Sequence, residues 1–342
     1  MTDKVRPTPV LLSPRFALWQ KQNLEAPDHQ NPVDCFFFCE STTKINTAMR
    51  TIDPSTKTAA DMHQILVGTV APRPIAFAST LNAEGHVNLA PYSFFNVFGT
   101  KPPILVFSPV LRGKDSSAKD TLNNVRAVPE VVINVVNYDI VRQMAVTSIQ
   151  YPPEVDEFTK SGLTPQESEV VRPFRVKESP AQFECIVRDI ISYGDHGGAA
   201  QLVICEAVRI HLADHIFDEK DRIDPQQIDL MGRMGRAFYN RASGASIHRI
   251  YQPFHELGIG YEALPASIRN STVLTGNDLG HLAAITQPPS QEELTALRQD
   301  AKIAQLLEQP NAVQLLHEQA KQAIVEGDIA LAARLAYVLE EK

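Results

Sequence analysis

The chain of 342 residues has little of what marks several special classes of protein. Its 4 cysteines are too few for a disulfide scaffold. Cys35 and Cys39 have no second Cys or His pair nearby and do not by themselves predict a metal site. Cys185 and Cys205 fall in expected strands, where we predict small buried side chains. Lys and Arg form no cluster, and a net charge of −8 is not the basic footprint of nucleic-acid binding.

Long apolar runs are also missing. Residues 104–110 and 131–136 are the longest, and a membrane-spanning helix needs roughly 20 residues. At the N-terminus, the apolar residues 10–12 are followed by Ser13 and Pro14, which interrupt the continuous core of a signal peptide. The sequence therefore predicts a cytoplasmic protein with no membrane and no nucleic-acid partner.

Several common catalytic motifs are absent. The chain has no Gly-x-Gly-x-x-Gly after a strand, no Gly-x-x-x-x-Gly-Lys-Ser/Thr, no His-Glu-x-x-His and no Gly-x-Ser-x-Gly. A Rossmann dehydrogenase or a hydrolase that depends on one of these motifs is therefore not supported.

The chain divides into three parts by composition. Residues 1–48 hold five prolines and show no sustained period, which predicts an irregular or disordered arm. Residues 49–287 read as one domain, and because Met49 opens it, an over-extended start codon is one hypothesis. Residues 288–342 are rich in Ala, Leu, Gln and Glu and predict three helices with stops at Pro310 and Gly327. Their apolar stripe is expected to pack on its neighbours: Leu294, Leu297, Ile303, Leu306 and Leu307.

Strands outnumber helices in the central part. Strands are expected at 73–81, 86–90, 102–109, 130–137, 181–193 and 199–212, and helices at 59–66, 118–127 and 138–148. Residues 82–85 form a turn signal between the first two strands, which predicts a hairpin. The strands are not spaced in regular strand-helix-strand units, so a closed or partly open barrel with attached helices fits better than a doubly wound sheet.

A polar segment, "RGKDSSAKDTLNN" at 112–124, opens the second expected helix. It places Ser116, Ser117, Lys119 and Thr121 beside the unpaired amides of the helix start, where an anion such as phosphate is favoured. The alternative is that Ser117 merely caps the helix, with Asp120 three residues later.

A second segment, "NLAPYSFFNVFGTKPP" at 88–103, crowds aromatic residues among prolines. Because Pro91 cannot donate a hydrogen bond, we expect the segment to leave regular ladder pairing there and to turn backbone amides and Ser93 or Asn96 toward a flat heterocycle. The apolar walls would come from Phe94, Phe95 and Phe98. The alternative is plain aromatic core packing.

These segments, together with "APRPIAFAST", "ILVFSP" and "KDTLNNVRAVPEVVINVV", resemble the flavin reductase-like family with an FMN-binding split barrel, which includes flavoredoxin-type proteins. The resemblance covers about residues 49–241. It implies a mainly β fold, a Greek-key split β-barrel with attached helices, and a homodimer that binds FMN near the subunit interface. The N-terminal arm and the C-terminal helices lie outside the resemblance.

The resemblance also implies site residues. The isoalloxazine and its surroundings would involve Arg73, Ser79, Thr80, Asn88, Ala90, Pro91, Ser93, Phe95 and Asn96. The phosphate would meet Lys119, Thr121 and Arg112, with Asp120 ordering the loop because a carboxylate does not itself attract phosphate.

A nicotinamide donor, NADH or NADPH, would approach near His196, Arg233 and Tyr239. The alternatives are a turn residue, a surface charge and a core aromatic, respectively. The family pattern reads Arg-x-Gly-Gly-x-x-Tyr, and here Arg236 replaces the second glycine.

With FMN bound, the flavin accepts hydride and no acid-base triad is required, so we predict no catalytic side chain. The resemblance therefore implies an NAD(P)H-dependent FMN reductase, which would pass reduced flavin to an oxygenase partner. The alternatives are a flavoprotein electron carrier, a flavin-binding module without nicotinamide turnover, and a barrel kept for assembly alone.

Overall fold

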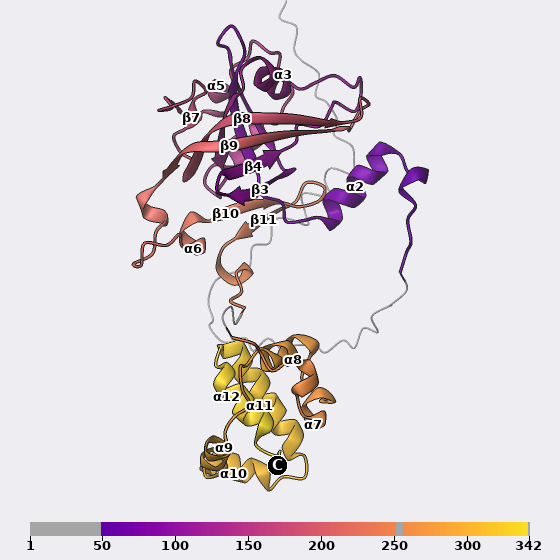
Figure 1. Ribbon diagram of the computed structural model, residues 1–342, viewed down its shortest axis with the longest axis vertical. Coiled ribbons are helices and arrows are strands. Elements are labelled where there is room, and N and C mark those ends of the chain that lie inside the picture. The colour runs from indigo at the N-terminus through magenta and orange to yellow at the C-terminus, as the bar shows by residue number, and fades with distance from the viewer. Residues whose placement is uncertain (1–48, 251–255, 341–342) are drawn as a thin grey trace, which may run out of the picture. The chain divides into compact units, whose positions relative to one another are not determined.

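The structure is a computed structural model of the chain, and it describes residues 49–250 and 256–340. Its largest element is a seven-stranded antiparallel sheet with the order β2-β1-β5-β8-β9-β4-β3 (Figure 1). The strands are β1 (Ala76–Leu81), β2 (Val87–Tyr92), β3 (Phe95–Thr100), β4 (Pro103–Phe107), β5 (Glu130–Val135), β8 (Ala181–Tyr193) and β9 (Ala200–Leu212). The predicted mainly β fold with attached helices is confirmed. The expected arm at 1–48 lies outside the described residues.

The two edge strands of this sheet, β2 and β3, are consecutive in the sequence, and only Ser93 and Phe94 separate them. Three steps between Cα atoms span at most about 11 Å. The chain can therefore pass from one edge to the other only if the sheet is rolled up. Within the described residues β2 and β3 do not pair with each other, so the roll stays open along this seam. This is the split barrel that was predicted.

Strand β1 is buried on both faces, because its side chains alternate between two apolar clusters. Ala76 and Ala78 belong to the cluster that includes Val131, Ile133, Cys185 and Cys205. Phe77 lies in a second cluster with Leu89, Met144 and Phe158. This period of two is that of a strand with packing on either side. The prediction that Cys185 and Cys205 are small buried side chains is confirmed.

The expected hairpin is confirmed. β1 and β2 pair antiparallel from Ala76↔Tyr92 to Leu81↔Val87. Gly85 supplies the turn with a φ of 88°, in the region that glycine enters at no steric cost. In the turn, the amide of Gly85 donates to the carbonyl of Asn82 at 3.1 Å.

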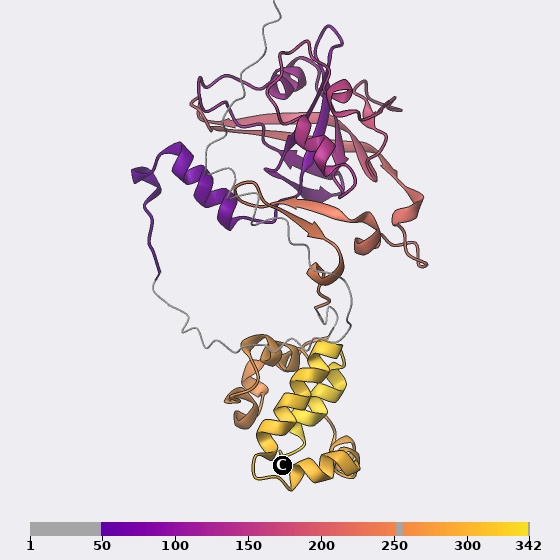
Figure 2. The same ribbon diagram turned by 180° about the vertical axis from the view of Figure 1, so that it is seen from behind.

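Five α-helices accompany the sheet in the described part before residue 250: α2 (Ala59–Thr69), α3 (Asp120–Ala127), α4 (Val141–Val146), α5 (Glu157–Ser161) and α6 (Pro225–Ile228). α4 and α5 contact β2 and cover one face of the sheet (Figure 2). The helix expected at 138–148 is shorter than predicted. The amide of Tyr138 donates instead to Asp229, and Asn137 forms a bridge to Leu230, so the chain enters α4 late.

Two small antiparallel sheets complete this part. β10 (Leu230–Arg233) pairs with β11 (Tyr239–Ala242), and β6 (Pro165–Gln166) pairs with β7 (Arg175–Val176). The backbone of Arg233 pairs with that of Arg73, with N–H to oxygen distances of 2.8 Å and 3.0 Å in the two directions. This bridge brings the β10–β11 turn to the segment before β1.

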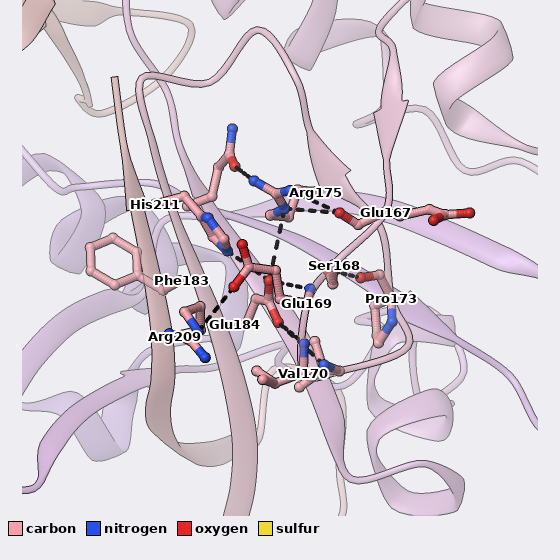
Figure 3. A network of polar contacts seen from close by, with 12 residues as sticks. Glu167, Ser168, Glu169, Val170, Pro173, Arg175, Phe183, Glu184, Arg209 and His211 are labelled. Carbon is pink, nitrogen blue, oxygen red and sulfur yellow. Dashed lines mark hydrogen bonds and ion pairs between the residues drawn. The ribbon is translucent and has the colours of Figure 1, made fainter. Parts of the chain in front are cut away.

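A buried carboxylate, Glu184 on β8, fastens the loop before β7 (Figure 3). Its side chain has 0% exposure, and its Oε1 atom lies 2.7 Å from Nε2 of His211 on β9. It also accepts hydrogen bonds from three amides of the loop: those of Glu169, Val170 and Val171. Burial alone would raise the pKa of Glu184, but these amides and His211 outweigh it, and the net pKa is lowered.

The C-terminal part is helical, with η4 (Tyr261–Ala263), α7 (Ala266–Arg269), α8 (Gly276–Ala283), α9 (Gln291–Arg298), α10 (Ala301–Leu307), α11 (Ala312–Glu326) and α12 (Ile329–Tyr337). The first of the three predicted helices is in fact two, because Asp300 caps α10 by accepting hydrogen bonds from the amides of Lys302 and Ile303. The expected apolar stripe packs on its neighbours as predicted. α11 and α12 lie side by side (Figure 1).

Side chains from Ile259 onward join the same helical cluster. The division of the chain at 287/288 stays a prediction, although residues 261–283 pack with the segment that follows it. No helix in the described residues is both long and apolar enough to span a membrane. The described residues also hold no group of three His, Cys, Asp or Glu side chains that could ligate a metal.

Candidate functional site

Three adjoining hollows surround Pro91 of β2, and we call them together the groove. The basic hollow has a volume of about 340 Å³ and runs from α2 past Ser93 to Arg236. The small hollow, of about 190 Å³, lies between Ser93 and Tyr239. The mixed hollow, of about 350 Å³, extends past Lys119 and α3. Because Pro91 lines all three, the groove follows the seam of the barrel.

Pro91 corrects one expectation. Pairing with β1 does not stop at this residue, because Pro91 stands opposite Phe77 and Tyr92 stands opposite Ala76. A proline is tolerated here because β2 is an edge strand with one neighbour. The chain leaves the ladder at Ser93, which lines both the basic and the small hollow.

Arg73 holds this corner in place. It is 7% exposed, and its guanidinium donates to the carbonyls of Val67 at 2.7 Å, Val70 at 2.8 Å and Met234 at 3.2 Å. Its Nε donates to the Ser93 hydroxyl at 3.3 Å. Burial lowers the pKa of Arg73, and the nearby charge of Arg233 adds to this. The side chain therefore orients Ser93 and joins the end of α2 to the β10–β11 turn.

The start of α3 forms a corner with a cationic side chain and free backbone amides. Lys119 occupies the N-cap position without a side-chain cap, and the amides of Asp120 and Thr121 have no acceptor among the described residues. The Lys119 ammonium lies 5.2 Å from the centre of the Tyr92 ring and forms no ion pair within the described part. Burial, followed by the charge of Arg112, lowers the pKa of Lys119. An unpaired cation beside free amides is suited to a phosphate.

Arg112 and Asp120 form an ion pair at 3.0 Å beside this corner, which offsets the carboxylate charge at the helix start. Arg112 also donates to the carbonyl of Ala118. The alternative that Ser117 caps the helix is wrong, because its hydroxyl donates to Asp115 at 2.6 Å.

A buried polar cluster lies beneath the groove. Asn88 donates to the hydroxyls of Thr80 at 3.2 Å and Thr121 at 2.8 Å, and the Tyr92 hydroxyl donates to Thr121 at 2.8 Å. Asn124 donates to Thr80 at 3.1 Å. Thr80 and Thr121 have 0% exposure and line none of the three hollows, whereas Asn88 lines the mixed hollow. These two threonines therefore support the groove from below.

The remaining ring-contact candidates fall into three groups. Ala90 lines the mixed hollow, close to Pro91. Ser79 is fully buried, and its hydroxyl has no hydrogen-bond partner in the described part of the chain. Phe95 packs against the barrel interior, and the exposed Asn96 accepts a hydrogen bond from the amide of Val97 at 2.8 Å.

Of the three expected aromatic walls, only Phe94 lines a hollow, the basic one, where its ring meets His63 edge-on at 6.0 Å. Phe95 belongs to the core, and Phe98 on β3 is 70% exposed. Phe94 therefore forms a groove wall and Phe95 packs in the core, whereas Phe98 does neither.

Two of the three residues expected at the nicotinamide-donor site are in contact. The guanidinium of Arg233 lies 4.5 Å from the centre of the Tyr239 ring, and both residues line the small hollow. His196 lies in an exposed turn and lines none of the three hollows, which favours its reading as a turn residue.

Among the lining residues of the basic hollow that were not anticipated are His63, Gln64, Met234 and Arg236. His63 and Gln64 lie on α2, ahead of the segments that carry the resemblance. For the turn between β10 and β11, the sequence offered one signal, which is that Arg236 replaces a glycine of the family pattern.

A family model described as flavin reductase like domain matches residues 67–236. An uncharacterized protein of Aquifex aeolicus is 37% identical over 183 residues, which cover 54% of this chain and 91% of that protein. Nitrilotriacetate monooxygenase component B from Bacillus cereus is 31% identical, with a TM-score of 0.55 over 60% of this chain and 99% of that chain. A protein with a split barrel domain from Shewanella frigidimarina is 22% identical, with a TM-score of 0.51 over 60% of this chain and 100% of that chain, and supports the fold alone.

A rolled antiparallel sheet with a groove along its open seam defines the chain as a split-barrel protein. The chain belongs to the flavin reductase-like family and is a flavin-related oxidoreductase.

Proposed function

We propose that the chain is an NAD(P)H-dependent flavin reductase that binds FMN in the groove. The observation that carries the proposal is the corner at Lys119, where a cation and two amides have no partner in the described part of the chain. A flavin mononucleotide needs an anion site for its phosphate and, next to it, a slot for a flat ring. Pro91, Tyr92 and Ser93 line the groove beside that corner, so the residues present fit the group.

The chain's own residues then have distinct tasks. Lys119 and the amides of Asp120 and Thr121 hold the phosphate, and Arg112 orders the loop through its ion pair with Asp120. Ser93, oriented by Arg73, offers a hydroxyl to the polar edge of the ring. Bound FMN would supply the hydride acceptor, so no acid-base pair is required of the protein.

We propose that Arg233 and Tyr239 receive the nicotinamide donor in the small hollow. The arginine is held over the tyrosine ring at 4.5 Å, an arrangement worth about 0.5–1 kcal/mol at an exposed site. His196, which lies outside the groove, is not part of this proposal.

We also propose a homodimer and an oxygenase partner. The edge strand β3 exposes Val97 (61%) and Phe98 (70%). An exposed apolar edge strand is a surface on which another chain can pack. The similarity to a protein named as a monooxygenase component supports a partner that consumes reduced flavin.

The decisive test is anaerobic mixing of the FMN-loaded protein with NADH or NADPH while the flavin absorbance is followed. We expect at least one nucleotide to bleach the flavin. If dithionite bleaches it and neither nucleotide does, the chain is an electron carrier or a flavin-binding module. FMN in the purified protein would exclude a barrel kept for assembly alone.

A further inference from the structure

The basic hollow carries positive charge without any carboxylate. Among the described residues, its lining includes four cationic side chains, Arg73, Lys119, Arg233 and Arg236, and neither an Asp nor a Glu. The whole chain is acidic, with 40 Asp and Glu against 32 Lys and Arg. The charge of this hollow is therefore opposite in sign to the net charge of the protein. Such a hollow is suited to a ligand with several negative charges.

Two of these four cations already have a task. Arg73 donates to backbone carbonyls and to Ser93, and Lys119 stands at the free amides of α3. Arg233 and Arg236 remain, the first at the end of β10 and the second in the turn between β10 and β11. Neither forms an ion pair with any described carboxylate, and the only contact between them is a hydrogen bond from Nη2 of Arg233 to the carbonyl of Arg236 at 2.8 Å.

Arg236 is held in a backbone conformation that disfavours it. Its φ is 58°, in the left-handed region, where a residue with a Cβ atom is less stable by roughly 1–2 kcal/mol. The related family pattern has glycine at this place. The turn itself is closed by backbone bonds of other residues, from Met234 N to Phe238 O at 3.0 Å and from Phe238 N to Gly235 O at 3.3 Å. These backbone bonds do not involve the side chain of Arg236.

The guanidinium groups of Arg233 and Arg236 differ in their contacts and in their exposure. Arg233 is fixed between the Tyr239 ring and the Arg236 carbonyl and lines both the basic and the small hollow. Arg236 is exposed, lines the basic hollow and has its guanidinium 5.7 Å from the centre of the Phe238 ring. Guanidinium groups match the oxygens of a phosphate in forked pairs.

We propose that Arg236 binds the 2′-phosphate of NADPH and makes the site selective for NADPH over NADH. The inference rests on the proposed function, in which the corner at Lys119 takes the flavin phosphate and leaves these two arginines for the second substrate. With the nicotinamide half near Ser93, the adenosine half would extend along the basic hollow toward the exposed Arg236. A terminal phosphate dianion is the group that distinguishes NADPH from NADH at that end.

The test compares binding of 2′,5′-ADP and 5′-AMP to the FMN-loaded protein by calorimetry, so it does not depend on turnover. We expect the wild type to bind 2′,5′-ADP more tightly, and Arg236→Gly to weaken 2′,5′-ADP about 10-fold while leaving 5′-AMP unchanged, the effect of losing one charge-assisted contact. Arg236→Lys keeps the charge and should retain part of the preference. Equal weakening of both ligands, or no change in either, overturns the inference.

Folding and function are controlled separately. Glycine relieves the strain at φ 58°, so Arg236→Gly should unfold at or above the wild-type temperature. Asp221→Gly, also at a φ of 58° but in the turn after η2 (Asp214–Ile216), should leave both ligands unaffected. If NADH bleaches the flavin as well as NADPH does, the specificity inference fails and the reductase proposal stands. If neither bleaches it, the reductase proposal fails, whatever the 2′,5′-ADP result.

Discussion

Arg73 and Ser93 are joined by a hydrogen bond of 3.3 Å, and this bond links the segment before β1 to the two-residue step between the edge strands. The same guanidinium donates to three carbonyls, from the end of α2 and from the β10–β11 turn. One buried side chain therefore sets the position of the groove floor and of both flanking segments.

We expect Arg73→Met to lower the free energy of unfolding by about 2–4 kcal/mol, because it leaves buried carbonyls without donors. FMN affinity should also fall, because Ser93 loses its orienting partner. Urea unfolding followed by circular dichroism measures the first effect, and flavin titration under native conditions measures the second. Arg249→Met, at an exposed arginine, is the matched control and should change neither quantity. A stable Arg73→Met variant with full FMN affinity contradicts the role given to this residue.

Lys119 should contribute to the binding of the flavin phosphate and not to the binding of the ring. We expect Lys119→Met to weaken FMN about 10-fold or more and to leave riboflavin affinity nearly unchanged, because riboflavin has the same ring and no phosphate. Fluorescence titration with both flavins measures the two affinities. An equal loss for FMN and riboflavin would refute the phosphate assignment.

Thr121→Val is the comparison for this experiment. Its hydroxyl is buried and accepts from Asn88 and Tyr92, so the loss should appear as about 1–3 kcal/mol of stability. We expect the FMN to riboflavin ratio of this variant to stay near that of the wild type.

Much of this architecture follows from the sequence, because its signals are local. The β-branched runs predict the strands, and Gly85 predicts the hairpin turn. The burial of Thr121 also had a local signal. It precedes Leu122 and stands four residues before Val125, so these residues share the inward face of α3.

The parts that were missed depend on contacts between distant segments. The backbone bridge between Arg73 and Arg233 joins a residue before β1 to a residue after β9. No periodicity of the sequence predicts a contact between segments so far apart. His63 and Arg236 line one hollow only because of that pairing. Pro91 was misjudged because its tolerance depends on β2 being an edge strand, a property of the strand order.

Glu184 should make stability depend on pH. Its folded-state pKa is lowered below 4.5, so its contribution is present above the unfolded pKa and is lost as the pH falls through the folded value. We expect Glu184→Gln to lower the free energy of unfolding at pH 7, by about 3–5 kcal/mol, because it leaves the buried Arg175 and the half-buried His211 without their carboxylate.

The difference between Glu184→Gln and the wild type should narrow as the pH is lowered from 7 toward 3. Urea unfolding at several pH values measures this. Glu219→Gln, at an exposed position, should follow the wild type throughout. A difference that stays constant with pH would show that packing, not the charge of Glu184, stabilises the loop.

The exposed edge at β3 gives a test of the homodimer. Phe98 is 70% exposed on an edge strand, so a charge there should be well tolerated by an isolated protomer and poorly tolerated in an interface. We expect the wild type to sediment as a dimer and Phe98→Glu to shift it toward the monomer in analytical ultracentrifugation, with the unfolding temperature of the monomer as the fold control. Phe238→Glu places the same charge on another exposed phenylalanine (61%) and should leave the dimer intact. If Phe98→Glu sediments as the wild type does, β3 is not the interface, because a glutamate in an apolar contact costs several kcal/mol unless it is paired.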